Sequence, residues 1–253
     1  MTQIALQLIR SATLKLRLGA RTLLIDPYLA AQHEGVSYGG RLRSPLAPLP
    51  LPVTEILAGV DAAFVSHLHS DHFDEAARRL LPPDMPILCA AALADDIRAS
   101  GFRHVTAIET DTQWSGTGFE LTGGRHGPDS VLAEMGEVHG FVASMADAPT
   151  LYWVGDSIWC PEVRTVVDRR RPAHVVVHAC GATWRGSGSL VMDEHHVEAL
   201  LRHAPWATVT ATHLDCVDHA TTSRARLARH FRSMPTLRRR LWIPADGETL
   251  ALD

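Results

Sequence analysis

Cysteine is scarce in this sequence, and its cysteines are not spaced for a shared structural task. No Cys-x-x-Cys pair occurs, so a closed structural zinc site built from thiolates is excluded. Residues 1–10 alternate between apolar and polar side chains like a strand, and they lack the basic and apolar regions of a signal peptide. Unpaired cysteines without an export signal predict a reduced, cytoplasmic protein. The isolated cysteines are Cys89, Cys160, Cys180 and Cys216.

Long apolar runs and excess positive charge are lacking as well. No stretch of about 18 apolar residues occurs, so we expect no membrane-spanning helix and no membrane partner. Lys15 is the only lysine, and 28 acidic against 24 basic side chains give a net charge of −4. A chain with this balance and no Lys/Arg-rich insertion is poorly suited to grip a polyanion, so no nucleic acid is expected. The expected partner is a small-molecule substrate, with a homo-oligomer left open.

Apolar periodicity and turn residues predict alternating strands and helices. The chain opens with strands, enters a proline- and glycine-rich loop over residues 30–52, and then alternates between the two element types. We expect this loop to line a pocket, because long loops in compact domains are often functional. Helices are predicted over 74–81, 91–100, 162–169, 193–203 and 222–231. Strands are predicted over 4–9, 14–18, 22–25, 62–66, 86–89, 105–108, 114–122, 138–145, 150–154, 175–177, 207–211, 241–244 and 249–252.

A series of strands followed by strand–helix alternation occurs in both halves of the chain. Two such halves build two mixed β-sheets that pack face to face with helices on their outer faces. The predicted fold class is therefore α/β (α+β), a four-layer αββα sandwich. With 253 residues and 46% hydrophobic content, the chain is large enough for one well-buried domain, which we expect to span residues 1–253.

The segment His67-Leu68-His69-Ser70-Asp71-His72 is the richest source of metal-ligand side chains in the sequence. It follows an apolar run at 62–66, which predicts a loop at the end of a buried strand. Alternate side chains of an extended segment share a face, so His67 and His69 can point at one ion. After the chain turns, Asp71 and His72 can face a second ion. Imidazole and carboxylate ligands suit Zn, Mn or Fe and leave positions open for water.

Three more ligand-type residues follow predicted strands elsewhere in the chain. His126 lies in a Gly-Gly-Arg-His-Gly-Pro segment, Asp156 follows a Tyr-Trp-Val-Gly segment, and His213 follows the β-branched stretch 208–212. Strand ends are the places where a scaffold can hold ligands rigidly while loops shape a pocket. These residues therefore complete a candidate metal site together with the 67–72 loop.

In this order, the motifs resemble those of the metallo-β-lactamase superfamily of metal-dependent hydrolases. The resemblance rests on HxHxDH, a later His, an Asp in a Gly-Asp pair after a strand, and a final His. More narrowly, the segments 26–29, 125–127, 151–156 and 212–219 resemble the branch that includes the L-ascorbate 6-phosphate lactonase-like proteins. The match covers most of the chain.

The resemblance implies seven metal ligands divided between two divalent ions, with zinc expected first and manganese or iron as alternatives. The first ion would be held by His67, His69 and His126, the second by Asp71, His72 and His213, and Asp156 would bridge both. A water between the ions would become hydroxide near neutral pH and act as the nucleophile. No serine or cysteine nucleophile is then needed.

Other polar residues are candidates for supporting roles. Asp71 could help to shuttle a proton, and His219, six residues after His213, could contact substrate, support the site or begin a helix. Asp26 could hold a metal-binding His in the correct tautomer. His178 also follows a predicted strand, but the family pattern does not call for a His there, and it stays outside the predicted metal set. Arg41, Arg43 and Arg125 could grip an anionic substrate group.

Three functions are compatible with this pattern. The leading one is a dinuclear metal-dependent hydrolase of a small ester, lactone or phosphate-bearing metabolite. The second is a phosphodiesterase or nuclease of the same superfamily, against which the acidic net charge argues. The third is a non-catalytic, metal-containing ligand sensor that keeps the same residues for binding alone.

Overall fold

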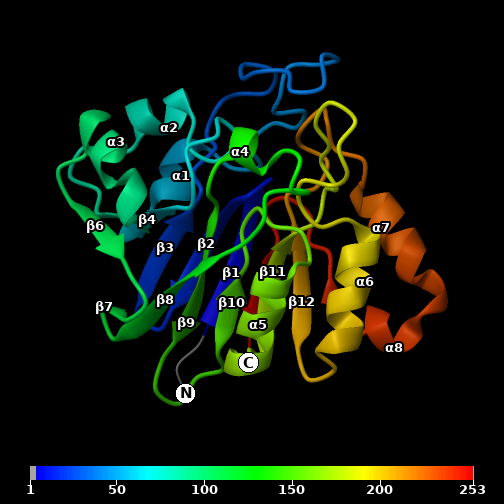
Figure 1. Cartoon of the computed structure of the whole chain (residues 1–253). Coiled ribbons are helices and arrows are strands. Elements are labelled where there is room, and N and C mark those ends of the chain that lie inside the picture. Colours follow the sequence, from blue (N-terminus) through cyan, green and yellow to red (C-terminus); the bar gives the residue numbers. More distant parts are fainter. Residues whose placement is uncertain (1–3, 253) are drawn as a thin grey trace.

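A computed structural model describes residues 4–252 and contains two seven-stranded mixed sheets (Figure 1). In the first sheet, β1, β2 and β3 form an antiparallel meander, and β3, β4, β5 and β6 run parallel. The last strand of the chain, β14, pairs antiparallel with β1 and closes the order β14-β1-β2-β3-β4-β5-β6. The strands are β1 (Ile4–Arg10), β2 (Thr13–Leu18), β3 (Arg21–Ile25), β4 (Ala62–Val65), β5 (Ile87–Ala90), β6 (Val105–Ile108) and β14 (Thr249–Leu252).

The second sheet repeats this organisation with later segments of the chain. Its order is β13-β12-β11-β10-β9-β8-β7, antiparallel from β7 to β10 and parallel from β10 to β13. The strands are β7 (Thr112–Trp114), β8 (Thr117–Gly123), β9 (His139–Ser144), β10 (Leu151–Trp153), β11 (His174–His178), β12 (Thr208–Thr212) and β13 (Leu241–Trp242).

The two sheets pack against each other through a hydrophobic core that both of them fill. Phe64 of β4 lies edge-on to Phe141 of β9 and Trp153 of β10, with ring centroids 4.8 and 5.6 Å apart. Two further apolar clusters lie on the outer faces of the sheets, beneath the helices. The predicted four-layer αββα sandwich of mixed sheets is therefore confirmed.

The helices form the two outer layers, on opposite sides of the molecule (Figure 1). Several begin where the sequence places a capping side chain: Asp74 accepts the amide hydrogen of Ala77, and Asp193 accepts those of His195 and His196. No helix of residues 4–252 is long and apolar enough to cross a membrane. The helices are α1 (Val53–Leu57), α2 (Glu75–Leu80), α3 (Ala94–Ala99), α4 (Leu132–Met135), α5 (Pro161–Arg170), α6 (Glu194–His203), α7 (Arg224–His230) and α8 (Pro235–Arg238).

Several element boundaries differ from the prediction. The helix expected over 91–100 is a 3₁₀ turn at Ala91–Leu93 followed by α3, and the strand expected over 114–122 is instead the hairpin β7–β8. Ser115 and Gly116, both at positive φ, form the turn of that hairpin. The sequence did not predict α1, α4 and α8, because helices of four or five residues carry too few apolar positions to show a period.

Candidate metal centre

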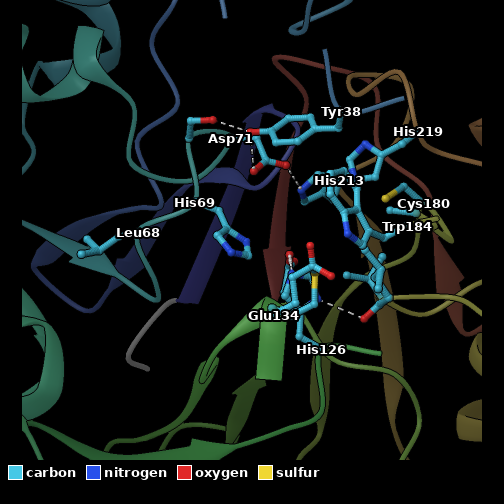
Figure 2. A pocket seen from close by; sticks show the side chains of 16 residues that line it. Tyr38, Leu68, His69, Asp71, His126, Glu134, Cys180, Trp184, His213 and His219 are labelled. Carbon is cyan, nitrogen blue, oxygen red and sulfur yellow. Dashed lines mark hydrogen bonds and ion pairs between the residues drawn. The ribbon is translucent and has the colours of Figure 1, made fainter. Parts of the chain in front are cut away.

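The predicted ligand residues meet at one edge of the sandwich, where the parallel strands of both sheets end. The 67–72 loop follows β4, while Asp156 follows β10 and His213 follows β12. His126 follows β8, which reaches the same edge. Because the carboxyl ends of neighbouring parallel strands lie together, residues far apart in the sequence converge there. Figure 2 shows His69, Asp71, His126 and His213 turned toward a common space.

Asp156 lies at the centre of this cluster. Its Oδ2 is 3.2 Å from His72 Nε2, 3.4 Å from His126 Nε2 and 3.8 Å from His67 Nε2. One carboxylate oxygen therefore faces imidazoles from both of the predicted ligand sets. This placement fits the bridging position that the resemblance implied for Asp156.

The donor atoms fall into two groups, each compact enough to hold an ion. His67, His69 and His126 form one group, which is the predicted first set. His72, His213 and Asp156 belong to the other, together with His178. Asp71 adjoins this second group, because its Oδ2 lies 3.5 Å from His213 Nε2. All seven predicted metal-site residues are thus brought together.

The buried imidazoles are oriented by contacts to their outer nitrogen atoms. His72 Nδ1 lies 2.7 Å from Asp26 Oδ2, which is the contact predicted for Asp26. His126 Nδ1 lies 3.2 Å from the Leu190 carbonyl oxygen, and His67 Nδ1 lies 2.8 Å from Ser66 Oγ. Partners of this kind fix the ring orientation and leave Nε2 free to bind a metal.

The donor set fits divalent metal ions. His67 Nε2 is buried, and within residues 4–252 no group lies at hydrogen-bonding distance from it. Burial lowers the pKa of His67 well below its usual value, which keeps the ring neutral. Burial alone would raise the pKa of the Asp156 carboxyl, but His72 and His126 hold it well below its usual range. Neutral imidazole and ionised carboxylate are the forms that bind metals. Burial alone would lower the pKa of His72, but Asp156 and Asp26 raise it to about 10, so this ring would release its proton when an ion binds.

His178 is a buried member of the cluster that the predicted metal set omitted. It is the last residue of β11, and its Nδ1 lies 2.5 Å from Asp156 Oδ1. The contact engages Asp156 Oδ1, whereas His72, His126 and His67 lie nearest to Oδ2. The available signal was a polar residue at the end of an apolar strand, the same signal that identified Asp156 and His213.

A cavity of about 400 Å³ opens over the cluster (Figure 2). Much of its wall is apolar, and among the described residues that line it there is no Arg or Lys. Tyr38 of the 30–52 loop lines this cavity. The expectation that the loop lines the pocket is therefore confirmed for that residue. The other lining residues are Leu68, His69, Ser70, Asp71, His126, Glu134, Met135, Asp156, Cys180, Ala182, Trp184, Leu190, Val191, His213 and His219.

The three arginines considered for substrate binding do not line this cavity. Arg125 forms ion pairs with Glu162 and Asp129 at 2.9 Å each. The Arg43 side chain donates to backbone carbonyls of its own loop, and Arg41 donates to the carbonyl oxygen of Asp218. The anion-gripping role predicted from the sequence is therefore corrected: these guanidinium groups hold the protein's own loops and surface.

His219 lines the cavity beside the metal cluster. Its ring lies 4.9 Å from that of Tyr38, centroid to centroid, and burial lowers its pKa. Within residues 4–252 its Nδ1 has no hydrogen-bond partner. It lies outside α7, which begins at Arg224 after the capping residue Ser223, so His219 does not begin that helix.

Comparisons with known proteins agree with this geometry. The family model described as a beta-lactamase superfamily domain matches residues 21–225. UPF0173 protein YddR of Bacillus subtilis (strain 168) is 32% identical over 247 residues, covering 95% of this chain and 97% of YddR. Two solved structures, each with 32% identity and a TM-score of 0.94, are similar over nearly their whole length.

The first of these structures is a possible metal-dependent hydrolase from Veillonella parvula DSM 2008, with 100% of both chains covered. The second is an isothiocyanate hydrolase from Delia radicum gut bacteria, with 98% of this chain and 99% of that chain covered. With the fold and the histidine–aspartate cluster described above, these matches show that the chain is a metal-dependent hydrolase that belongs to the beta-lactamase superfamily.

Proposed function

We propose that this chain is a dinuclear metallohydrolase whose substrate is a small, uncharged molecule with an electrophilic carbon. The observation that carries the proposal is the cavity, which joins a histidine–aspartate cluster to apolar walls without a lining cation. Apart from the metal ions, a phosphate group there would meet no Arg or Lys among the described residues that line the cavity, so its walls offer nothing to grip an anion. Of the substrate classes expected from the sequence, the ester and the lactone fit this cavity better than the phosphate-bearing metabolite.

Isothiocyanates are a further class with these properties. They are uncharged, carry an electrophilic carbon and bear an apolar group, and a relative with 32% identity is named an isothiocyanate hydrolase. The apolar wall formed by Leu68, Met135 and Leu190 would accommodate that apolar group. Isothiocyanates are therefore the first substrates to test, followed by neutral esters and lactones.

The residues that would hold the ions are those predicted from the sequence. His67, His69 and His126 would hold one ion, Asp71, His72 and His213 the other, and Asp156 would contact both. Bound metal would supply Lewis-acid polarisation of the substrate and a water nucleophile available near neutral pH. Zinc is the first ion to test, and manganese and iron accept the same donors.

The chain's own groups supply the remaining functions. Asp71 lines the cavity and lies 3.5 Å from His213, so its carboxylate is placed to accept a proton and to return it to a leaving group. His219 stands beside the same space and can contact the substrate. The apolar side chains exclude bulk water, which strengthens every polar contact inside the cavity.

The test combines metal content with turnover. Protein purified without chelators is analysed for metals and assayed with benzyl isothiocyanate, a neutral lactone and a phosphodiester. We expect about two ions per chain and turnover of an uncharged substrate, with both lost in His69→Ala and Asp156→Ala. His104→Ala serves as the matched control, because His104 is an exposed histidine that belongs to none of the donor groups. Wild-type turnover that survives in both site variants would refute the proposal.

The same experiment separates the alternatives. Preferred cleavage of the phosphate ester would favour the phosphodiesterase, against which the absence of a lining Arg or Lys among residues 4–252 argues. Two bound ions with ligand binding and no turnover of any substrate would favour the sensor.

A further inference from the structure

The 37–42 segment of the long loop is fastened to a single carboxylate, that of Asp218. Asp218 Oδ1 accepts the backbone amides of Tyr38 and Gly39, both at 2.9 Å. Its Oδ2 accepts the Ser37 hydroxyl at 2.6 Å and the backbone amides of Arg41 and Leu42 at 3.1 and 3.2 Å. Five donors converge on one side chain that lies about 180 residues away in the sequence. Such a carboxylate fixes the backbone on both sides of Tyr38.

The hydrogen bonds to Asp218 place the Tyr38 side chain over the histidine–aspartate cluster. Its ring packs against the ring of His219, the residue that follows Asp218. Asp218 thus holds the backbone of Tyr38, and its neighbour supports the ring. The hydroxyl points toward Asp71 and lines the cavity (Figure 2).

The Tyr38 hydroxyl donates its proton to Asp71 Oδ1 in a long hydrogen bond. Ser70 Oγ lies 2.5 Å away and can donate, because a serine hydroxyl is both donor and acceptor. The contact to Asp71 Oδ1 is 3.2 Å, beyond the usual range of about 2.5 to 3.0 Å for O–H···O bonds. A better acceptor in the cavity would therefore compete successfully for the phenol proton. Tyrosine is neutral near pH 7, so the donor is present at working pH.

We propose that Tyr38 is a catalytic residue that donates a hydrogen bond to the substrate atom that gains negative charge when water adds to the electrophilic carbon. Asp218 is the positioning residue that holds Tyr38 there. That atom is the nitrogen or sulfur of an isothiocyanate, or the carbonyl oxygen of an ester. The inference rests on the proposed function, because it assigns a task within the same cavity. A positioned donor is most effective where charge develops during the reaction.

The experiment compares Tyr38→Phe with wild type and with Tyr152→Phe, which removes a hydroxyl outside the cavity and is the matched control. Metal content, kcat and KM are measured for each. We expect Tyr38→Phe to keep its metals and its KM within about threefold and to lose kcat by about 10- to 100-fold, as for one lost donor. A kcat within twofold of wild type in a metal-replete Tyr38→Phe protein overturns the inference.

A second series tests the positioning role. Asp218→Asn replaces one acceptor oxygen with an amide that faces bound donors, so it should loosen the loop and lower kcat in the same direction. The double variant Tyr38→Phe/Asp218→Asn should be no slower than Tyr38→Phe alone, because the second change then has no hydroxyl to misplace. If the loss of kcat in the double variant equals the two single losses combined, Asp218 acts independently of Tyr38. That result would overturn the positioning role of Asp218.

A binding readout keeps the inference testable without turnover. Thiocyanate, a small anion with the N–C–S skeleton, is titrated calorimetrically into metal-loaded wild type, Tyr38→Phe and Tyr152→Phe. We expect Kd to rise about tenfold in Tyr38→Phe alone, as for one hydrogen bond to a charged acceptor. Equal affinities in the three proteins overturn the inference. If the wild type turns over nothing but shows this pattern, the proposed function fails and the hydrogen-bond role stands. A metal-loaded wild type that neither turns over nor binds thiocyanate overturns both.

Discussion

Replacing Asp26 with Asn should weaken metal binding although Asp26 lies behind the ligands. Asp26 is fully buried, and its carboxylate accepts the Ser66 amide at 2.8 Å, the Ser66 hydroxyl at 2.7 Å and His72 Nδ1 at 2.7 Å. An Asn at this position has one oxygen for these contacts. If that oxygen serves the Ser66 amide, the NH₂ group faces His72 Nδ1.

His72 then has two options, and both are unfavourable. It can accept from the amide through Nδ1, which places its proton on Nε2, the atom that faces Asp156 and the metal position. It can also keep the productive tautomer, with two buried donors opposed at a cost of about 1–3 kcal/mol. Either outcome predicts metal affinity about 10- to 100-fold weaker.

The assay is a competition titration of zinc against a chromophoric chelator, followed by elemental analysis. Asp74→Asn is the matched control, because Asp74 is also a buried carboxylate and accepts the amides of Ala77 and Ala30 at 2.6 Å each. The control should lose stability and keep its metal affinity. An Asp26→Asn protein that holds two ions as tightly as wild type would refute the role assigned to this contact.

Two predictions concern stability. Phe141→Ala removes a fully buried ring between the sheets and should lower the free energy of unfolding by about 3–5 kcal/mol in a urea titration; a loss below about 1 kcal/mol would contradict this packing. Burial alone would raise the pKa of Asp193, but hydrogen bonds from His196 and Ser189 hold it well below its usual range. The stabilisation that Asp193 gives as an N-cap is therefore fully present above about pH 4, the pKa of an Asp in the unfolded chain. It is lost as the pH falls through the lower pKa of Asp193 in the folded protein. The Tm difference between wild type and Asp193→Asn should be larger at pH 5 than at pH 3 and should shrink as the pH falls below about 4.

The histidine–aspartate cluster could be predicted because short segments of the sequence identify its residues. The spacing within 67–72 and the apolar strands before His126, Asp156 and His213 are visible in the sequence, and parallel strands bring their ends together. The mixed sheets were predictable for the same reason, because a short run of apolar or β-branched residues predicts each strand.

The parts that escaped prediction depend on contacts between distant segments. Tyr38 lies in a loop without periodicity, and its place is set by Asp218, which no local pattern links to it. His178 gave a weak signal, because one histidine after a strand has no partner at a fixed spacing. The position of Arg125 next to His126 suggested a substrate contact. The sequence does not reveal that the Arg125 guanidinium forms ion pairs with Glu162 and Asp129.

The pairing of β14 with β1 has a consequence for how the first sheet folds. In register, Gln7 lies opposite Thr249 and Ile4 opposite Leu252, so one edge of the first sheet is completed by a strand about 240 residues later in the sequence. Before β14 pairs, β1 presents unpaired amides and carbonyls along this edge, and forming the contact means closing a loop of about 240 residues. The first sheet therefore depends on a non-local contact, which forms more slowly than the hairpins beside it.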